Sequence, residues 1–297
     1  MKKWYRDYGL AARMILTMFL LAVLYLAFLA VVLTFGGALT NILLIFMMLI
    51  LFAQFFFSDR LVLWSTGGRI VTEQEEPRLH ETISRLCAIA DLPKPKIAIV
   101  ESNVPNAFAT GRSKNSAVVA VTTSLKQKLS QPELEAVLAH ELSHVKNRDM
   151  LVITIASFLS TVAALLVRNM LFFGIGGGNR DRDKGAGAAI IVFVVSLVVW
   201  IISFLLIRAL SRYREFAADR GSAIITGQPS HLASALMAIS GVMERVPSRD
   251  LREMEGMNAF FIIPAISGDS IMSLLSTHPT VEARIRALEE MERRMEF

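Results

Sequence analysis

Four long apolar runs interrupt a chain whose other stretches have amphipathic patterns. Each run lacks charged residues over about 20 positions, the length of helix that crosses a bilayer core: Met14–Thr34, Ala38–Phe57, Met150–Val167 and Ala188–Ile207. The pattern therefore predicts two helical membrane hairpins, the first turning at Phe35–Gly37 and the second in the loop Arg168–Gly187. Because the third run is short, a competing interpretation places it inside a soluble core.

The composition also indicates a membrane protein, because 54% of the residues are apolar and 19% are charged, whereas soluble domains carry roughly 25% charged residues. Basic residues gather beside the apolar runs. With four crossings, nearly all of them lie on one side, which the positive-inside rule assigns to the cytoplasm. No basic stripe is interleaved with aromatic residues, so we expect the lipid bilayer as a partner and no nucleic acid. The predicted division is residues 1–57 and 150–207 as membrane hairpins, and 58–149 and 208–297 as cytoplasmic catalytic parts.

Both predicted cytoplasmic parts show helical spacing, and the first also shows two short β-rich runs. Lys96–Val100 and Ala117–Thr122 are separated by a polar stretch containing a glycine, which suggests a hairpin. Ser130 and Glu133 form a capping-box pattern at the start of a helix that continues to His144. The other predicted helices are Leu79–Ala90, Arg208–Ile225, Ser230–Val246 and Pro279–Met295. The apolar segment Gly256–Gly268 fits a core strand, a loop or a surface that dips into lipid.

The pattern His140-Glu141-Leu142-Ser143-His144 is the clearest chemical signal in the chain. Residues four apart on a helix lie on one face, so both imidazoles can reach one ion. Zinc makes water nucleophilic near neutral pH, and Glu141 is placed to accept the proton of that water. The alternative is a surface helix with two solvated histidines. We favour one Zn²⁺ per chain, because two imidazoles and a carboxylate suit that ion.

A catalytic zinc needs a third protein ligand, and chain geometry favours Glu215. His144 lies six residues before the third apolar run, and Glu215 lies eight residues after the fourth. If both helices continue out of the membrane, the two residues emerge at the same height, roughly 10 Å from its edge. Asp219, one turn later, is then placed to hold a ligand histidine. The alternative for Glu215 is a surface ion pair with a neighbouring arginine.

The motifs and the order of the apolar runs resemble the HtpX family of heat-shock membrane metalloproteases, which is related to the CAAX prenyl endopeptidases. The resemblance covers essentially the whole chain and includes Glu215–Asp219, Asn106–Gly111 and Ser276–Pro279. It implies that His140, His144 and Glu215 bind zinc and that Glu141 is the catalytic base. It also implies a stress-related role in quality control, cutting misfolded or excess membrane proteins from the cytoplasmic side of the cell membrane.

Two further groups of residues are weaker candidates. Asn106, Ala107, Phe108 and Ala109 lie beside a predicted strand, where an exposed edge would pair with an extended substrate, although a structural loop fits equally well. His278 precedes a predicted helix, so it is placed either to donate to the oxyanion of the reaction or to cap and pack the helix.

The sequence therefore predicts a mainly α membrane protein, with four transmembrane helices and a cytoplasmic zincin-like metalloprotease domain that carries a small β element. Its expected substrates are membrane proteins or juxtamembrane polypeptides. A prenyl-protein endopeptidase and a membrane scaffold without catalysis are the alternatives.

Overall fold

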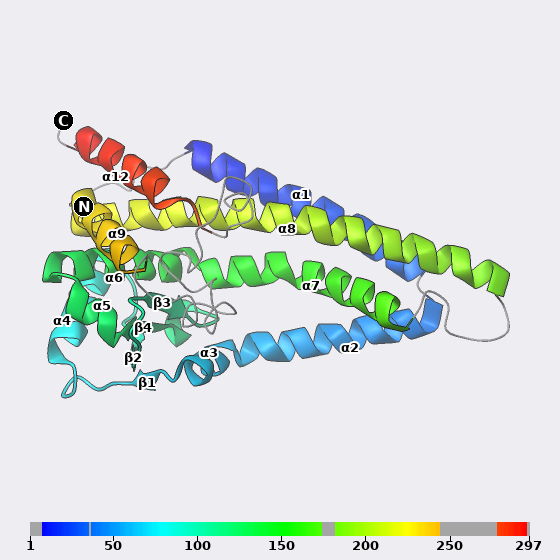
Figure 1. Cartoon of the computed structure of the whole chain (residues 1–297), viewed down its shortest axis with the longest axis horizontal. Helices are drawn as coiled ribbons and strands as arrows, with labels where there is room; N and C mark the ends of the chain where they lie inside the picture. The colour runs from blue at the N-terminus through cyan, green and yellow to red at the C-terminus, as the bar shows by residue number, and fades with distance from the viewer. Residues whose placement is uncertain (1–7, 36, 174–181, 244–277, 296–297) are drawn as a thin grey trace. The chain divides into compact units, whose positions relative to one another are not determined.

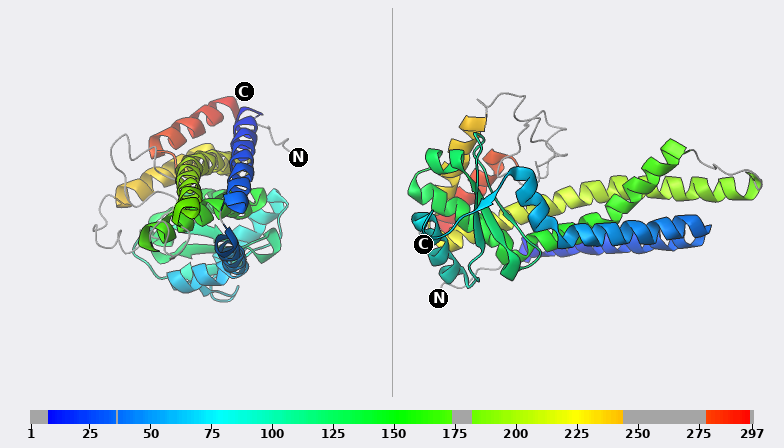
Figure 2. Two further views of the ribbon diagram at one scale, coloured as in Figure 1. Left: turned by 90° about the vertical axis from the view of Figure 1, so that its right-hand side faces the viewer. Right: turned by 90° about the horizontal axis from the view of Figure 1, so that it is seen from below.

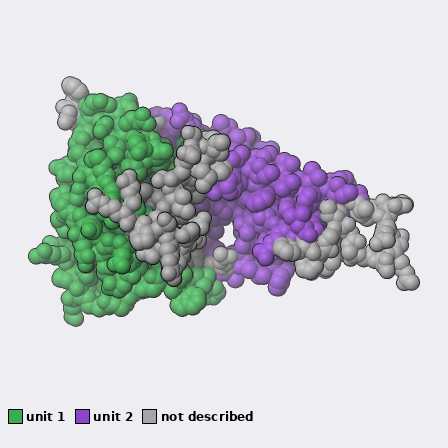
Figure 3. Space-filling view, viewed as in Figure 1, with its two compact units in different colours: residues 1–7, 57–151, 211–297 green, residues 8–56, 152–210 purple. Residues whose placement is uncertain are grey.

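A computed structural model describes residues 8–35, 37–173, 182–243 and 278–295 (Figure 1). The chain divides into two compact units (Figure 3). The described residues of unit 1 come from 57–151, 211–243 and 278–295, and those of unit 2 come from 8–56 and 152–210. The predicted segment Gly256–Gly268 lies outside the described residues.

Unit 2 is built from long apolar helices. They are α1 (Tyr8–Phe35), α2 (Gly37–Phe56), most of α7 (Asp149–Phe173) and the first part of α8 (Arg182–Thr226). Residues such as Phe28, Val162 and Val199 pack in the core between the helices, while large apolar side chains such as Phe19, Ile45 and Ile201 remain exposed. Apolar residues on both sides of a helix are typical of a membrane span.

Within the described residues, three helices are long and apolar enough to cross a membrane. They are Tyr8–Phe35, Asp149–Leu171 and Gly187–Thr226, and α2 adds a shorter apolar stretch, Leu44–Ala53. The expectation of a multi-pass membrane protein is therefore confirmed. The interpretation of the third apolar run as the core helix of a soluble domain does not fit, because α7 is long and carries exposed apolar residues such as Ile155.

Unit 1 contains a mixed sheet, with the order β1-β2-β4-β3 among the described residues. Its strands are β1 (Arg69–Ile70), β2 (Lys96–Val100), β3 (Ala107–Thr110) and β4 (Val118–Thr122). The predicted hairpin between the second and fourth of these strands is wrong, because β2 and β4 are parallel neighbours. The true hairpin joins β3 to β4. Gly111 lies in that connection with φ of 125°, where a Cβ would lie 2.6 Å from the carbonyl oxygen of Ser116.

Helices cover both faces of this sheet, so its strands are apolar on both sides. Ile97 and Val119 pack toward α4 (Pro77–Ala90) and α6 (Gln131–Asn147) in the main core. The alternate residues Ala98 and Val118 pack with Val62 and Leu63 of α3 (Ser58–Thr66). This arrangement leaves β3 at the edge of the sheet, next to α6.

The remaining helices of unit 1 are α5 (Thr123–Lys128), the 3₁₀ turn η1 (Lys114–Ser116), α9 (Pro229–Met243) and α12 (Val281–Met295). α12, red in Figure 2, packs against α9, which in turn packs against α6. The predicted helices at Leu79, Arg208, Ser230 and Pro279 are thus present with shifted ends. The last of them begins at Val281, where Thr280 Oγ1 accepts a hydrogen bond from the backbone of Ala283.

Candidate metal centre

α6 carries both histidines of the predicted motif and has a well-defined start and end. Its capping box is formed, since the backbone N–H of Ser130 donates to Glu133 over 2.8 Å. It ends at Arg148, which takes a left-handed conformation with φ of 57°. Asp149 follows as the first residue of α7. The change of direction at Arg148 therefore brings the start of α7 close to the last turn of α6.

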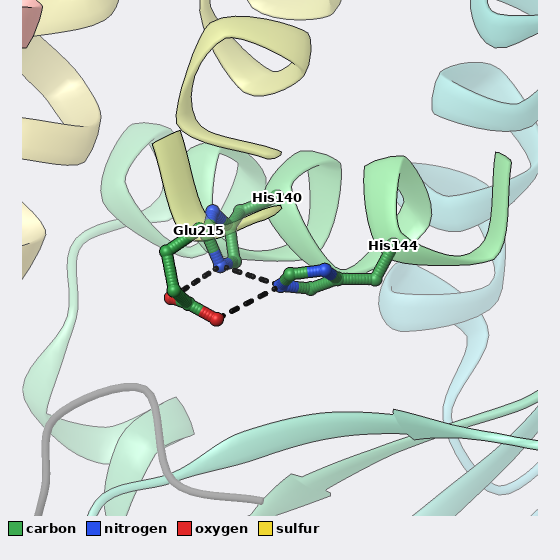
Figure 4. A group of neighbouring side chains, drawn as sticks. All are labelled: His140, His144 and Glu215. Carbon is green, nitrogen blue, oxygen red and sulfur yellow. Dashed lines mark hydrogen bonds and ion pairs between the residues drawn. The ribbon is translucent and has the colours of Figure 1, made fainter. Parts of the chain in front are cut away.

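His140, His144 and Glu215 point their ligand atoms at one another (Figure 4). The two Nε2 atoms are 3.1 Å apart, His144 Nε2 is 3.5 Å from Glu215 Oε1, and His140 Nε2 is 3.7 Å from Glu215 Oε2. Ligand atoms placed about 2.0–2.1 Å from a tetrahedral ion lie roughly 3.3–3.5 Å apart. The three residues therefore fit a zinc ion, and the geometry leaves a fourth direction for water or substrate.

Glu215 reaches the histidines because α8 packs closely on α6. Gly221 lies directly over Ser143, and a Cβ at position 221 would lie 2.2 Å from the Ser143 hydroxyl oxygen. One residue on, Ser222 Oγ donates to the carbonyl oxygen of Ala136 over 2.7 Å. The glycine and the hydroxyl together set the distance between the two helices. Glu215 is 5% exposed, which excludes the surface ion pair considered above.

Each histidine is held through its second ring nitrogen by a carboxylate. His140 Nδ1 donates to Asp219 Oδ1 over 2.9 Å, and His144 Nδ1 donates to Asp149 Oδ2 over 2.6 Å. Such contacts fix the ring orientation and leave Nε2 to bind the metal. The contact with Asp219 matches the sequence prediction. Asp149 was missed, although its place just after the end of the motif helix was a usable signal.

Two buried arginines, also missed from the sequence, balance these carboxylates. Arg284, on α12, donates to both oxygens of Asp219 over 2.6 and 2.9 Å and lies 3.3 Å from Glu215 Oε2. Burial lowers the pKa of Arg284, but the Asp219 and Glu215 carboxylates outweigh that effect and raise it. Arg214 forms an ion pair with Asp149. A buried carboxylate is stable only when it is paired in this way.

Glu141 lies at the same centre but contributes no ligand atom to the cluster. Its side chain is buried, and it accepts a hydrogen bond from the backbone of Ala109 on β3. Burial raises the pKa of the Glu141 carboxyl above its usual range; both histidines oppose this shift and Glu215 adds to it. A carboxylate with a raised pKa is a better proton acceptor, which suits a general base.

The structure also brings His278 to this centre and places the other group of candidates on and beside a strand next to α6. His278 Nδ1 lies 3.2 Å from Glu215 Oε2, and the side chain is 6% exposed. Ala107, Phe108 and Ala109 form most of the edge strand β3, and Asn106 directly precedes it. All four residues are buried, so the edge is not exposed, contrary to the expectation from the sequence. Their roles in the reaction remain predictions.

Comparisons with known proteins agree with this site. The model of peptidase family M48 matches residues 73–292. A protein named Protease HtpX homolog 2 from Methanosarcina mazei is 65% identical over 99% of both chains. A Protease HtpX homolog from Moorella thermoacetica is 58% identical over 98% of this chain and 97% of that protein.

The fold is similar to the crystal structure of Ste24p from S. mikatae, with a TM-score of 0.53 and 17% identity. That likeness covers 95% of this chain and 66% of the other, and it shows a shared fold only. The family model includes all three residues of the candidate metal centre, and the relatives match over nearly the full length. The chain therefore belongs to peptidase family M48, as a membrane metallopeptidase of the HtpX type.

Proposed function

We propose that this protein is a zinc endopeptidase that cuts misfolded or excess membrane proteins on the cytoplasmic side of the membrane. The observation that carries the proposal is the buried cluster of His140, His144 and Glu215, with Glu141 beside it. Two imidazoles, one carboxylate and an open position are the ligand set of a catalytic zinc site. A scaffold without catalysis has no need for this arrangement.

His140, His144 and Glu215 would hold the ion, one per chain. Zinc, when bound, supplies the Lewis acidity that makes water nucleophilic near neutral pH. The Glu141 carboxylate accepts the proton of the attacking water and returns it to the leaving amine nitrogen. His278, next to Glu215, is positioned to donate to the oxyanion that forms on the substrate carbonyl.

The substrate backbone is proposed to pair with the outer edge of β3, contacting Asn106, Ala107, Phe108 and Ala109. In the described residues this strand pairs with β4 alone. The Glu141 contact with the backbone of Ala109 supports this, because it places the edge strand directly beside the proposed base. Extended pairing of this kind accepts many sequences, which suits the removal of damaged proteins.

The proposed topology has four transmembrane helices, with hairpins at residues 1–57 and 150–207 and catalytic parts at 58–149 and 208–297. Three long apolar helices and the shorter apolar stretch in α2 support it. The positive-inside rule supports a cytoplasmic position for both catalytic parts. This arrangement predicts substrates that lie within or next to the bilayer.

The purified protein in detergent is expected to bind about one zinc per chain and to lose proteolysis when a chelator is added. Adding zinc back should restore cleavage. Glu215→Gln keeps the shape of the third ligand but removes its charge, so its zinc affinity should fall by a factor of at least about 10–100. Metal analysis and a casein or membrane-substrate assay would measure both effects. A wild-type protein that cuts substrate without bound metal would refute the proposed chemistry.

Asp149→Asn is expected to weaken zinc binding by about 10- to 100-fold, because His144 loses the carboxylate that orients it. Competition with a chromophoric chelator would measure the affinity. Asp91→Asn is the matched control, since Asp91 is exposed at the end of α4 and lies outside the site. Equal zinc affinities for the two variants would show that Asp149 does not position the ligand.

A further inference from the structure

A pocket lies beside the metal centre, between the end of β3 and the junction of α6 and α7. Its wall includes the partly exposed side chain of His144 and the residues Ala109, Thr110 and Gly111. The pocket is therefore adjacent to a proposed metal ligand and to the edge strand. All of its lining residues belong to unit 1.

The pocket is basic. Arg112, Lys114 and Arg148 line it, and Asp149 is the acidic residue in its wall. The Asp149 charge is already balanced, because its carboxylate is shared between His144 and Arg214. In the described part of the chain, neither Lys114 nor Arg148 forms an ion pair. Lys114 and Arg148 therefore present positive charge to the pocket, next to His144.

Lys146, two residues after His144 on α6, lies outside the lining of the pocket. Its ammonium group donates to the carbonyl oxygen of Ala90 over 2.7 Å.

The register of β3 directs a bound peptide toward this pocket. The backbone of Thr122 donates to Asn106, so Asn106, Phe108 and Thr110 face β4 in the hydrogen-bonded pairs. Ala107 and Ala109 therefore turn their backbone groups away from β4, and the Ala109 N–H donates there to Glu141. A peptide that pairs with Ala107 and with the Ala109 carbonyl oxygen would extend past Thr110 to the pocket, within about three residues of the site at 3.3 Å per residue.

We propose that this basic pocket binds an acidic side chain of the substrate, within three residues of the bond that is cut. Lys114 and Arg148 would contact the carboxylate, and Arg112 would add positive charge. The proposal rests on the proposed endopeptidase function. A carboxylate in the peptide fits better than a lipid phosphate, because the pocket shares its wall with the edge strand and with His144.

The experiment compares quenched fluorescent peptides that carry Glu, Gln or Lys at each of the three positions on either side of the cleaved bond. At one position, kcat/KM should be about 5- to 20-fold higher for Glu than for Lys, as expected for charge complementarity in a partly exposed pocket. Lys114→Glu should remove or reverse this ratio at the same position. Lys128→Glu, an equal charge change at an exposed site outside the pocket, should leave the ratio as in wild type.

An unchanged ratio in Lys114→Glu, or no preference in wild type, would overturn the proposal. If Lys114→Glu folds poorly, Lys114→Gln gives the same test with a smaller expected change. Stimulation by phosphatidylglycerol vesicles that is lost in Lys114→Glu, without any preference among peptides, would assign the pocket to lipid and also overturn it. Cleavage of the Gln peptides that stops in Glu141→Gln would show that the endopeptidase function stands even if this specificity fails.

Discussion

Glu141→Gln is expected to lower kcat by about 10²–10⁴-fold while zinc binding stays at the wild-type level. The substitution keeps the size and shape of the side chain but removes its ability to accept a proton. Glu141 is buried beside the metal centre, yet the three ligand atoms of the cluster come from other residues. The loss should therefore appear in the chemical step and leave the metal in place.

The measurement pairs single-turnover cleavage with metal analysis on the same preparation. Glu135→Gln is the matched control, because it makes the same change on the same helix at a partly exposed ion pair with Arg85. An exposed pair of this kind contributes about 0–1 kcal/mol, so its activity should stay close to wild type. If Glu141→Gln retains most of its activity, another group is the base. If it loses zinc, Glu141 supports the metal rather than the reaction.

The local parts of this site could be predicted from the sequence, because they depend on the geometry of single helices. His140 and His144 share a helical face wherever that helix forms, and the Ser130 capping pattern marks its start. The role of Glu215 could be predicted for a related reason. Counting residues from two apolar runs of known direction places it level with His144, and the cluster in the structure includes both.

The parts that could not be predicted depend on contacts between distant segments. Arg284 lies 65 positions from Asp219. Its spacing from Val281 and Leu288 places it on the apolar face of its helix, but that helix alone does not identify its partner. The prediction of the sheet was wrong for the same reason. The strand that begins at Ala107 is short and rich in small residues, so its pattern does not predict a strand. The sequence therefore suggests a hairpin of β2 and β4, which are in fact parallel.

Arg284→Met should destabilise unit 1 by about 3–5 kcal/mol, the usual cost of leaving a buried charge without its partner. Arg284 is 1% exposed and binds both oxygens of Asp219, which is fully buried. Met keeps much of the volume, so the loss comes from the charge. In a thermal scan this corresponds to a midpoint lower by roughly 10 °C. Arg294→Met, in the same helix but at an exposed pair with Glu290, should shift the midpoint little.

The metal gives a further test of this assignment, because zinc would supply positive charge close to Glu215, which Arg284 also approaches. The destabilisation by Arg284→Met should therefore be larger in chelator than in excess zinc. Adding Asp219→Asn should restore part of the stability, since it removes one of the carboxylates left unpaired. Equal losses for Arg284→Met and Arg294→Met would mean that Arg284 does not balance the charge of the metal centre. A loss that is independent of both zinc and Asp219 would assign Arg284 to packing alone.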